Sequence, residues 1–131
     1  MKILQFLKLI PCFYLPILLY LINRFFVGPA GIYQMWKWFD IPMHILGGAA
    51  VTYSFILVLR KLNKKIIIKE RLFEVLILIG LFALVAIFWE FYEFIMHIFL
   101  SLEQNTLEDT LSDFAFGLIG GLIVEIGRAH V

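Results

Sequence analysis

The sequence predicts an all-α protein, a bundle of four transmembrane helices with the N-terminus and the C-terminus in the cytoplasm. Hydrophobic residues make up 63% of the 131 residues and the mean hydropathy is +0.96, whereas soluble domains use apolar residues for about half of the chain. Four apolar runs approach or exceed the roughly 20 residues that a membrane-spanning helix needs. Six of the eleven Lys and Arg residues lie in 60–71. This basic segment sets the predicted orientation, because cytoplasmic loops carry the excess of basic residues.

The first two helices are expected over residues 6–27 and 41–59. The first run has the basic start and apolar stretch of a signal peptide, but no clear cleavage site follows and further spans come later, so we expect a retained helix. Gly28, Pro29 and Gly31 predict a turn after it. The small residues 47–50 of the second helix would let a neighbouring backbone approach closely.

The last two helices are expected over residues 72–100 and 107–125. The former would be about 43 Å long at 1.5 Å per residue, more than the roughly 30 Å hydrocarbon core, so it must tilt or protrude. The latter starts at a capping-box pattern, Thr106-Leu107-Glu108-Asp109. It also carries Gly117 and Gly121 at GxxxG spacing, which predicts a face for close helix packing and for association of two copies.

The four helices form one predicted domain, residues 1–125. Residues 126–131 can be encoded by ATCGGAAGAGCACACGTC, which reads like a common sequencing-library adapter, so we expect them to be a remnant and give Arg128 and His130 no role. Cys12 is the single cysteine, so no intrachain disulfide can form. The net charge of +1 predicts no bulk affinity for nucleic acid.

Ionisable residues interrupt the last three helices, always at the end away from the basic segment: Asp40, His44, Glu90, Glu93, His97, Asp109 and Asp113. Spacings of three or four residues put the members of each helix on one face. Counted from the basic segment, those of the second and third helices rise about 24 to 33 Å, with His97 further out at about 39 Å. Three helices are therefore expected to direct acids and imidazole into one layer on the outward side.

A charge at membrane depth costs about 2.5 to 3.5 kcal/mol at the helix centre on insertion scales, and neighbouring carboxylates repel one another. A bound divalent metal is one way to neutralise these carboxylates. The predicted ligands are Asp40, His44, Glu90, Asp109 and Asp113. Their chemistry leaves zinc, iron, manganese and magnesium open, and the Glu-x-x-His motif of di-iron bundles is absent.

Each of these residues also has a structural interpretation. Asp40 precedes Ile41-Pro42 as an N-cap would, and Asp109 fits the third position of a capping box. His44 could make an interhelical hydrogen bond. Glu90, Glu93 and Asp113 lie too far inside their helices to cap them, so for these the alternative is a polar network that serves packing alone.

Three motifs carry a resemblance to a known group of proteins: Asp40-x-x-x-His44-x-x-Gly47-Gly48, Trp89-Glu90 and Asp109-Thr110-x-x-Asp113-x-x-x-Gly117-x-x-Gly120. Over residues 36–121 the chain resembles the small bacterial integral membrane proteins called YjdF-like and, more distantly, VanZ-like. The VanZ-like pattern commonly has Asn where Asp113 stands and a basic residue where Ile41 stands, so the YjdF-like relation is favoured and glycopeptide resistance is not carried over. The resemblance implies a multi-pass protein of the bacterial cytoplasmic membrane.

Three functions stay open. In the enzyme, a hydrolase or transferase, a metal activates water or polarises a phosphoryl or acyl oxygen of a lipid or envelope precursor, with Glu93 as general base. In a proton or metal-ion handling protein the acids titrate, although residues 55–59 and 75–88 offer no polar group for a path through the inner half. In a partner-binding module the cluster only fixes helix register. The chain has no Gly-x-Ser-x-Gly elbow, Walker loop or His-Glu-x-x-His motif.

Overall fold

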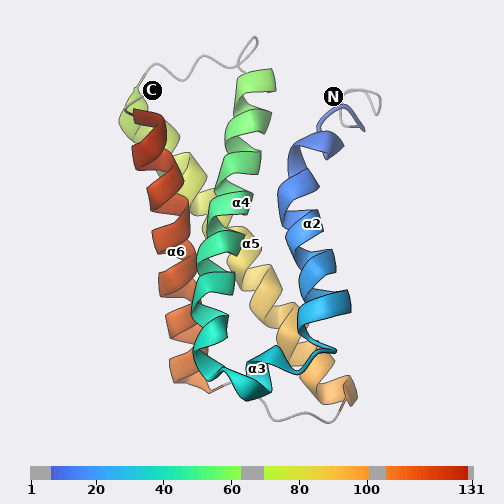
Figure 1. Cartoon of the computed structure of the whole chain (residues 1–131). Helices are drawn as coiled ribbons and strands as arrows, with labels where there is room; N and C mark the ends of the chain where they lie inside the picture. The colour runs from blue at the N-terminus through green and yellow to red at the C-terminus, as the bar shows by residue number, and fades with distance from the viewer. Residues whose placement is uncertain (1–6, 63–69, 101–105, 130–131) are drawn as a thin grey trace.

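The computed structural model describes residues 7–62, 70–100 and 106–129, and it confirms the all-α fold (Figure 1). Four helical stretches are long and apolar enough to cross a membrane: Ile10–Val27, Lys37–Leu62, Arg71–Leu100 and Leu107–Arg128. Both chain ends lie at one end of the bundle (Figure 1). Which end faces the cytoplasm stays a prediction, and most of the basic segment, residues 63–69, lies outside the described residues.

The first span consists of three consecutive helical segments, the 3-10 helix η1 (Ile10–Phe13), the α-helix α2 (Tyr14–Ile22) and the π-helix η2 (Asn23–Val27). Pro11 lies in the first turn of η1, where its missing N–H leaves no helical hydrogen bond unmade. The predicted turn follows. Gly31 has a φ of 68°, a left-handed conformation that glycine adopts without steric cost.

Two short helices that the sequence pattern did not predict join the first span to the second: α3 (Ile32–Met35) and η3 (Lys37–Phe39). The Tyr33 hydroxyl donates a hydrogen bond of 2.8 Å to Asn23 Oδ1 on η2. The Tyr33 ring also packs edge-on against Phe39, with centroids 5.9 Å apart. Tyr33 thereby fixes the end of the first span against the start of the second.

The three long helices are α4 (Asp40–Leu62), α5 (Arg71–Leu100) and α6 (Leu107–Ala129). Their starts agree with the predicted ones to within one residue. Two of them run further than predicted, α4 to residue 62 rather than 59 and α6 to residue 129 rather than 125. The prediction ended α4 at residue 59, where the apolar run ends. The helix continues because the next three residues, Arg60, Lys61 and Leu62, are good helix formers. We call the end of the bundle at which α4 and α6 begin and α5 ends the acidic end.

Glycines bring α4 and α6 into backbone contact. A Cβ atom added at Gly48 would overlap the carbonyl of Gly117, and one at Gly120 would overlap the carbonyl of Ile45. The predicted small-residue packing is therefore present between these two helices. Gly121 faces Thr52, so α4 of the same chain covers the GxxxG face, and association of two copies through it stays a prediction.

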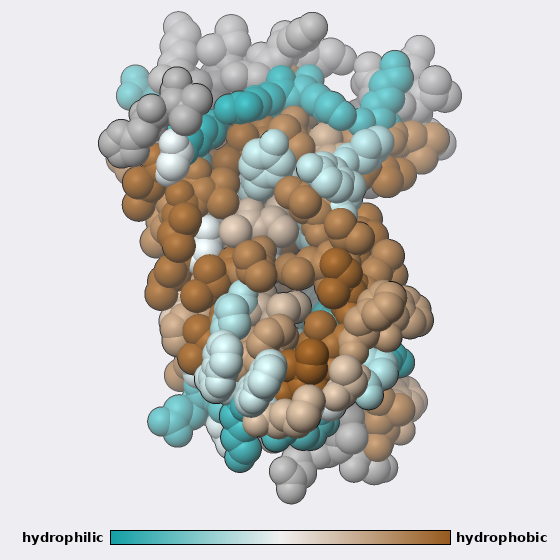
Figure 2. Space-filling view, in the orientation of Figure 1, coloured by the Kyte–Doolittle hydropathy of each residue, from teal (hydrophilic) through white to brown (hydrophobic). Residues whose placement is uncertain are grey.

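The face of the bundle in Figure 2 is largely apolar between its two ends. Phe25, Phe88 and Phe99 are 65%, 65% and 79% exposed. Exposed aromatic surface on this scale fits contact with lipid and not with water. The tightly packed interior is small and lies midway along the bundle, where Ile56, Leu78 and Phe82 are buried.

A second polar cluster lies at the end of the bundle that holds the chain termini. Arg128 Nη1 lies 2.9 Å from Glu74 Oε1, and Arg128 Nη2 lies 2.7 Å from Glu125 Oε1. Sequence reasoning did not predict this contact between α5 and α6. Arg128 belongs to residues 126–131, whose origin as an adapter remnant stays a prediction, so we assign the cluster no function.

Candidate metal centre and its cavity

A cavity of about 560 Å³ extends from the acidic end into the space between α2, α4, α5 and α6, and we call it the main cavity. Its volume falls within the roughly 300–1,000 Å³ of typical ligand sites. Its polar lining comes from all four spans and the turn between the first two: Asn23, Tyr33, Lys37, Asp40, His44, Glu90, Glu93, His97 and Asp113. The predicted layer of acids and imidazole is therefore the wall of a cavity.

Asp40, His44 and Asp113 form the first candidate ligand group, which we call the acid–His group. His44 Nε2 lies 3.4 Å from Asp40 Oδ1 and 3.3 Å from Asp113 Oδ1. Gly48 and Gly117, which pack backbone to backbone, each come one helical turn after His44 and Asp113. The glycine contact thus holds α4 and α6 close enough for the two side chains one turn away to meet.

The distances within the acid–His group are compatible with ion pairs and with ligands of one shared cation. An N–H···O hydrogen bond normally joins atoms 2.7 to 3.2 Å apart. Two ligands bound tetrahedrally at the usual Zn–N and Zn–O lengths lie about 3.3 Å from each other. The three side chains offer ligand atoms that all lie within 4.8 Å of one another, as a shared cation requires. Their imidazole and carboxylates suit zinc, iron and manganese.

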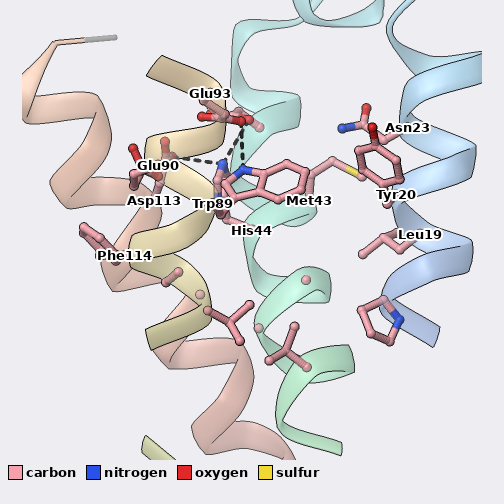
Figure 3. A pocket seen from close by; sticks show the side chains of 18 of the residues that line it. Leu19, Tyr20, Asn23, Met43, His44, Trp89, Glu90, Glu93, Asp113 and Phe114 are labelled. Atoms are coloured by element: carbon pink, nitrogen blue, oxygen red, sulfur yellow. Dashed lines mark hydrogen bonds and ion pairs between the residues drawn. The ribbon is translucent and has the colours of Figure 1, made fainter. Parts of the chain in front are cut away.

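Glu90, Glu93 and Asp113 form a second candidate ligand group, the glutamate group, also with ligand atoms within 4.8 Å of one another. Glu90 Oε2 accepts a hydrogen bond of 2.9 Å from the Thr110 hydroxyl. Glu93 Oε1 accepts one of 2.8 Å from Trp89 Nε1. Figure 3 shows Glu90 and Glu93 of α5 and Asp113 of α6 converging with His44 of α4. Asp113 belongs to both groups.

Four of the five predicted ligands therefore lie together, Asp40, His44, Glu90 and Asp113, and so does the predicted base, Glu93. The structure does not bring Asp109 to them. Asp109 Oδ2 accepts hydrogen bonds of 2.7 Å from the Thr106 hydroxyl and 3.2 Å from the Thr106 N–H. The Asp109 N–H donates in return to Thr106 Oγ1 at 3.2 Å. These hydrogen bonds confirm the capping-box interpretation of Asp109. Asp109 lies apart from the other predicted ligands because one turn of helix separates it from Asp113 and carries it about 6 Å outward.

His97 lines the main cavity, as its predicted place at the outer rim requires. It also lines a second cavity, between α5 and α6, that shares Glu90 and Glu93. Among the described residues it belongs to neither candidate ligand group.

Sequence reasoning missed Tyr33, Asn23 and Thr110. Thr110 had a detectable signal, because it stands three residues before Asp113 and so shares its helix face. Tyr33 had none, because a short helix places it. Burial, and secondarily the charge of Asp40, raises the pKa of Tyr33 to about 12. Its hydroxyl therefore stays protonated at any physiological pH and donates to Asn23.

Comparison with known proteins gives a family but no characterised relative. No curated protein and no solved structure matches the chain. The comparison does not bear on the YjdF-like and VanZ-like resemblance, which stays a prediction. Residues 2–130 match the family described as Predicted membrane protein (DUF2238). Because this match spans nearly the whole chain, and the structure has four helices fit to cross a membrane, the protein is a multi-pass membrane protein that belongs to the DUF2238 family.

Proposed function

We propose that the protein is a metal-dependent hydrolase or transferase that acts on a lipid or envelope substrate at the outward face of a bacterial cytoplasmic membrane. The observation that supports it most directly is the spacing of the acid–His group, 3.3 and 3.4 Å from His44 Nε2 to two carboxylates. The group lies in the wall of a cavity large enough for a ligand. A structural network would need no such space beside it.

The residues divide into a binding set and a reacting set. The cation would be held by Asp40, His44 and Asp113. The hydrogen bond from the Thr110 hydroxyl would orient the Glu90 carboxylate beside it. A bound divalent metal would supply a Lewis acid that polarises a phosphoryl or acyl oxygen or activates water. Glu93 is the proposed general base, because the hydrogen bond from Trp89 fixes its carboxylate on the cavity wall. It would take a proton from the attacking water or hydroxyl.

The interior of the bundle argues against an ion path through the membrane. Phe82 packs against Gly117 in the wall of the main cavity, and Leu78 and Ile56 are buried further from the acidic end. Thr52 and Glu125 are also buried beside Leu78 and Phe82, around a space of only about 10 Å³. Within the described residues, this close packing between the main cavity and the opposite end favours a reaction over transport.

Elemental analysis of the detergent-purified protein tests the metal. We expect about one or two equivalents of a divalent metal in the wild type after incubation with zinc, manganese or magnesium, and its loss in Asp113→Asn, which belongs to both ligand groups. Asp109→Asn is the matched control, because Asp109 is an exposed capping residue of the same helix. Absence of metal from a folded wild type, or equal metal in both variants, would overturn the proposal.

A further inference from the structure

The main cavity has an apolar part that the metal centre does not explain. Away from the acidic end its walls are formed by Leu19 of α2, Val51 of α4, and Phe82, Val85 and Ala86 of α5. In Figure 3 Leu19 lies below Tyr20 on α2, on the side away from the labelled carboxylates. One continuous cavity therefore runs from charged side chains to hydrocarbon side chains.

The apolar part lies between α2 and α5. At the polar end Tyr20 bridges these helices, with its ring packed edge-on against Trp89 and Tyr92 at centroid distances of 5.9 and 6.3 Å. The hydroxyls of Tyr20 and Tyr92 lie 3.2 Å apart. Further from the acidic end η1 packs on α4, where Phe13 meets Phe55 edge-on at 5.4 Å, and in Figure 1 α2 diverges from α5.

The outward faces of the two helices that flank this space are apolar. Leu18 on α2 and Phe88 on α5 are 51% and 65% exposed. Both belong to spans that fit the hydrocarbon layer. The neighbour of these exposed faces is therefore lipid, and the residues of α2 and α5 that line the apolar part of the cavity, such as Leu19, Val85 and Ala86, are themselves apolar.

From this geometry we propose that the main cavity binds a membrane phospholipid, with one acyl chain between α2 and α5 and the phosphate beside the acid–His group. The proposal deepens the proposed function and rests on it for the role of the metal in neutralising the carboxylates. Lys37, which lines the polar part, adds a positive charge for the phosphate. The polar part lies at the membrane boundary, where phospholipid headgroups lie, and the apolar part lies at chain depth.

Other occupants fit less well. A peptide helix is about 10–12 Å across with its side chains, too wide for a cavity of about 560 Å³ enclosed by four helices. A small polar solute would fill the charged part and leave Val51, Val85 and Ala86 without a partner. A phospholipid matches both parts with one molecule.

Native mass spectrometry tests the proposal with palmitoyl-oleoyl phosphatidylglycerol as the probe. We expect a one-to-one lipid adduct on the wild type and its loss on Ala86→Trp, whose indole would fill the apolar part. Leu84→Trp is the matched control, because Leu84 lies on the same helix but is 51% exposed. Should Ala86→Trp fail to fold, Leu19→Trp against Leu18→Trp makes the same comparison on α2.

Palmitoyl-oleoyl glycerol, which has the same chains without the phosphate, tests the headgroup. We expect the phospholipid adduct to persist at collision energies that remove the diacylglycerol. No adduct on the wild type, equal adducts on Ala86→Trp and Leu84→Trp, or equal retention of the two lipids would each overturn the proposal. Metal content measured on the same samples separates the two hypotheses, because a metal-free protein with a cavity-dependent adduct refutes the metal centre alone.

Discussion

Asp113 is the side chain on which both ligand groups depend. Its side chain is 8% exposed, whereas the Asp40 side chain is 45% exposed. A buried carboxylate is retained in such a place only if a positive charge or hydrogen-bond donors compensate its desolvation. His44 lies 3.3 Å from it. The proposed cation would therefore compensate mainly the desolvation of Asp113, and the more exposed Asp40 would be a further ligand.

Glu93→Gln should separate chemistry from metal binding. If Glu93 is the base, the variant keeps the metal of the acid–His group, whose residues are untouched, and loses about 10²- to 10⁴-fold in turnover, the usual contribution of general acid–base catalysis. Metal analysis and steady-state assays on phospholipid phosphate and ester substrates measure the two effects. Glu108→Gln, at an exposed position on α6, is the control. Unchanged turnover in Glu93→Gln would remove this residue from the mechanism.

Tyr33 gives a spectroscopic test of the cavity mouth. The difference between the alkaline absorbance titrations of the wild type and Tyr33→Phe should report a phenol that ionises near pH 12, because burial and the charge of Asp40 disfavour the phenolate. The sign follows from linkage. A raised folded-state pKa contributes stability that is complete below the ordinary tyrosine value near 10 and declines as the pH rises toward about 12. A difference spectrum that titrates at the ordinary value would show that Tyr33 is solvated.

Residue spacing identified five of the clustered side chains but could not separate Asp109 from Asp113. Both lie on one face of α6, four residues apart, so periodicity gives them equal standing. What distinguishes them is depth, because α5 and α4 surround Asp113 while Asp109 lies outside with Thr106. Depth depends on how far neighbouring helices extend, and a single helix does not encode it.

At the scale of elements, the contact between α4 and α6 positions the site. Gly48 and Gly117 allow the backbones to touch. One turn earlier on the same faces of α4 and α6 lie His44 and Asp113. A wider separation of the helices would carry these two side chains apart by the same amount. Packing and ligand geometry are therefore set by the same residues.

Gly48→Leu should test this coupling. The side chain would overlap the Gly117 backbone, and overpacking of this kind costs about 1–3 kcal/mol or more. We expect a lower thermal unfolding temperature in detergent together with weaker metal binding. Gly47→Ala is the control, because nothing lies within 4 Å of a Cβ atom at that position. A destabilised Gly48→Leu protein that binds metal normally would show that the contact does not position the ligands.

The long helices were predictable because each is an apolar run bounded by charge, proline or a capping pattern, and their starts agree with the structure to within one residue. The short helices α3 and η3 were not. They hold only seven residues, too few for a periodic pattern, and tertiary contacts such as that of Tyr33 with Asn23 stabilise them.

At the scale of the molecule, the orientation in the membrane is still a prediction of the basic segment. In a Cys12→Ser background, a membrane-impermeant thiol reagent should label Trp38→Cys in intact cells and Arg60→Cys only after lysis. Both positions are exposed and lie at opposite ends of the second span. Cys12 is buried, so its removal leaves the surface unchanged. The reverse labelling pattern would place the acidic end in the cytoplasm.

The lateral position of the main cavity could not be predicted from the sequence. It depends on how the first span packs on its neighbours. Phe13 of η1 contacts Phe55 of α4, whereas Tyr20 of α2 contacts Trp89 of α5 toward the acidic end. The rotation and tilt of a membrane helix follow from packing against its neighbours and not from its own length or hydropathy. The sequence therefore predicted the three helices that supply the acids and the imidazole, but not that the first span also lines the cavity or which pair of helices leaves room between them.

The sharing of Asp113 has a consequence for biogenesis. The chain is made from its N-terminus, so the carboxylates of α4 and α5 are synthesised before α6, yet both ligand groups need Asp113 of α6. Neither group exists until this fourth span has entered the membrane. Until α6 has been synthesised, Asp40, Glu90 and Glu93 therefore lack the Asp113 carboxylate beside which they lie in the complete fold. A ribosome stalled before residue 113 would leave both proposed ligand groups incomplete.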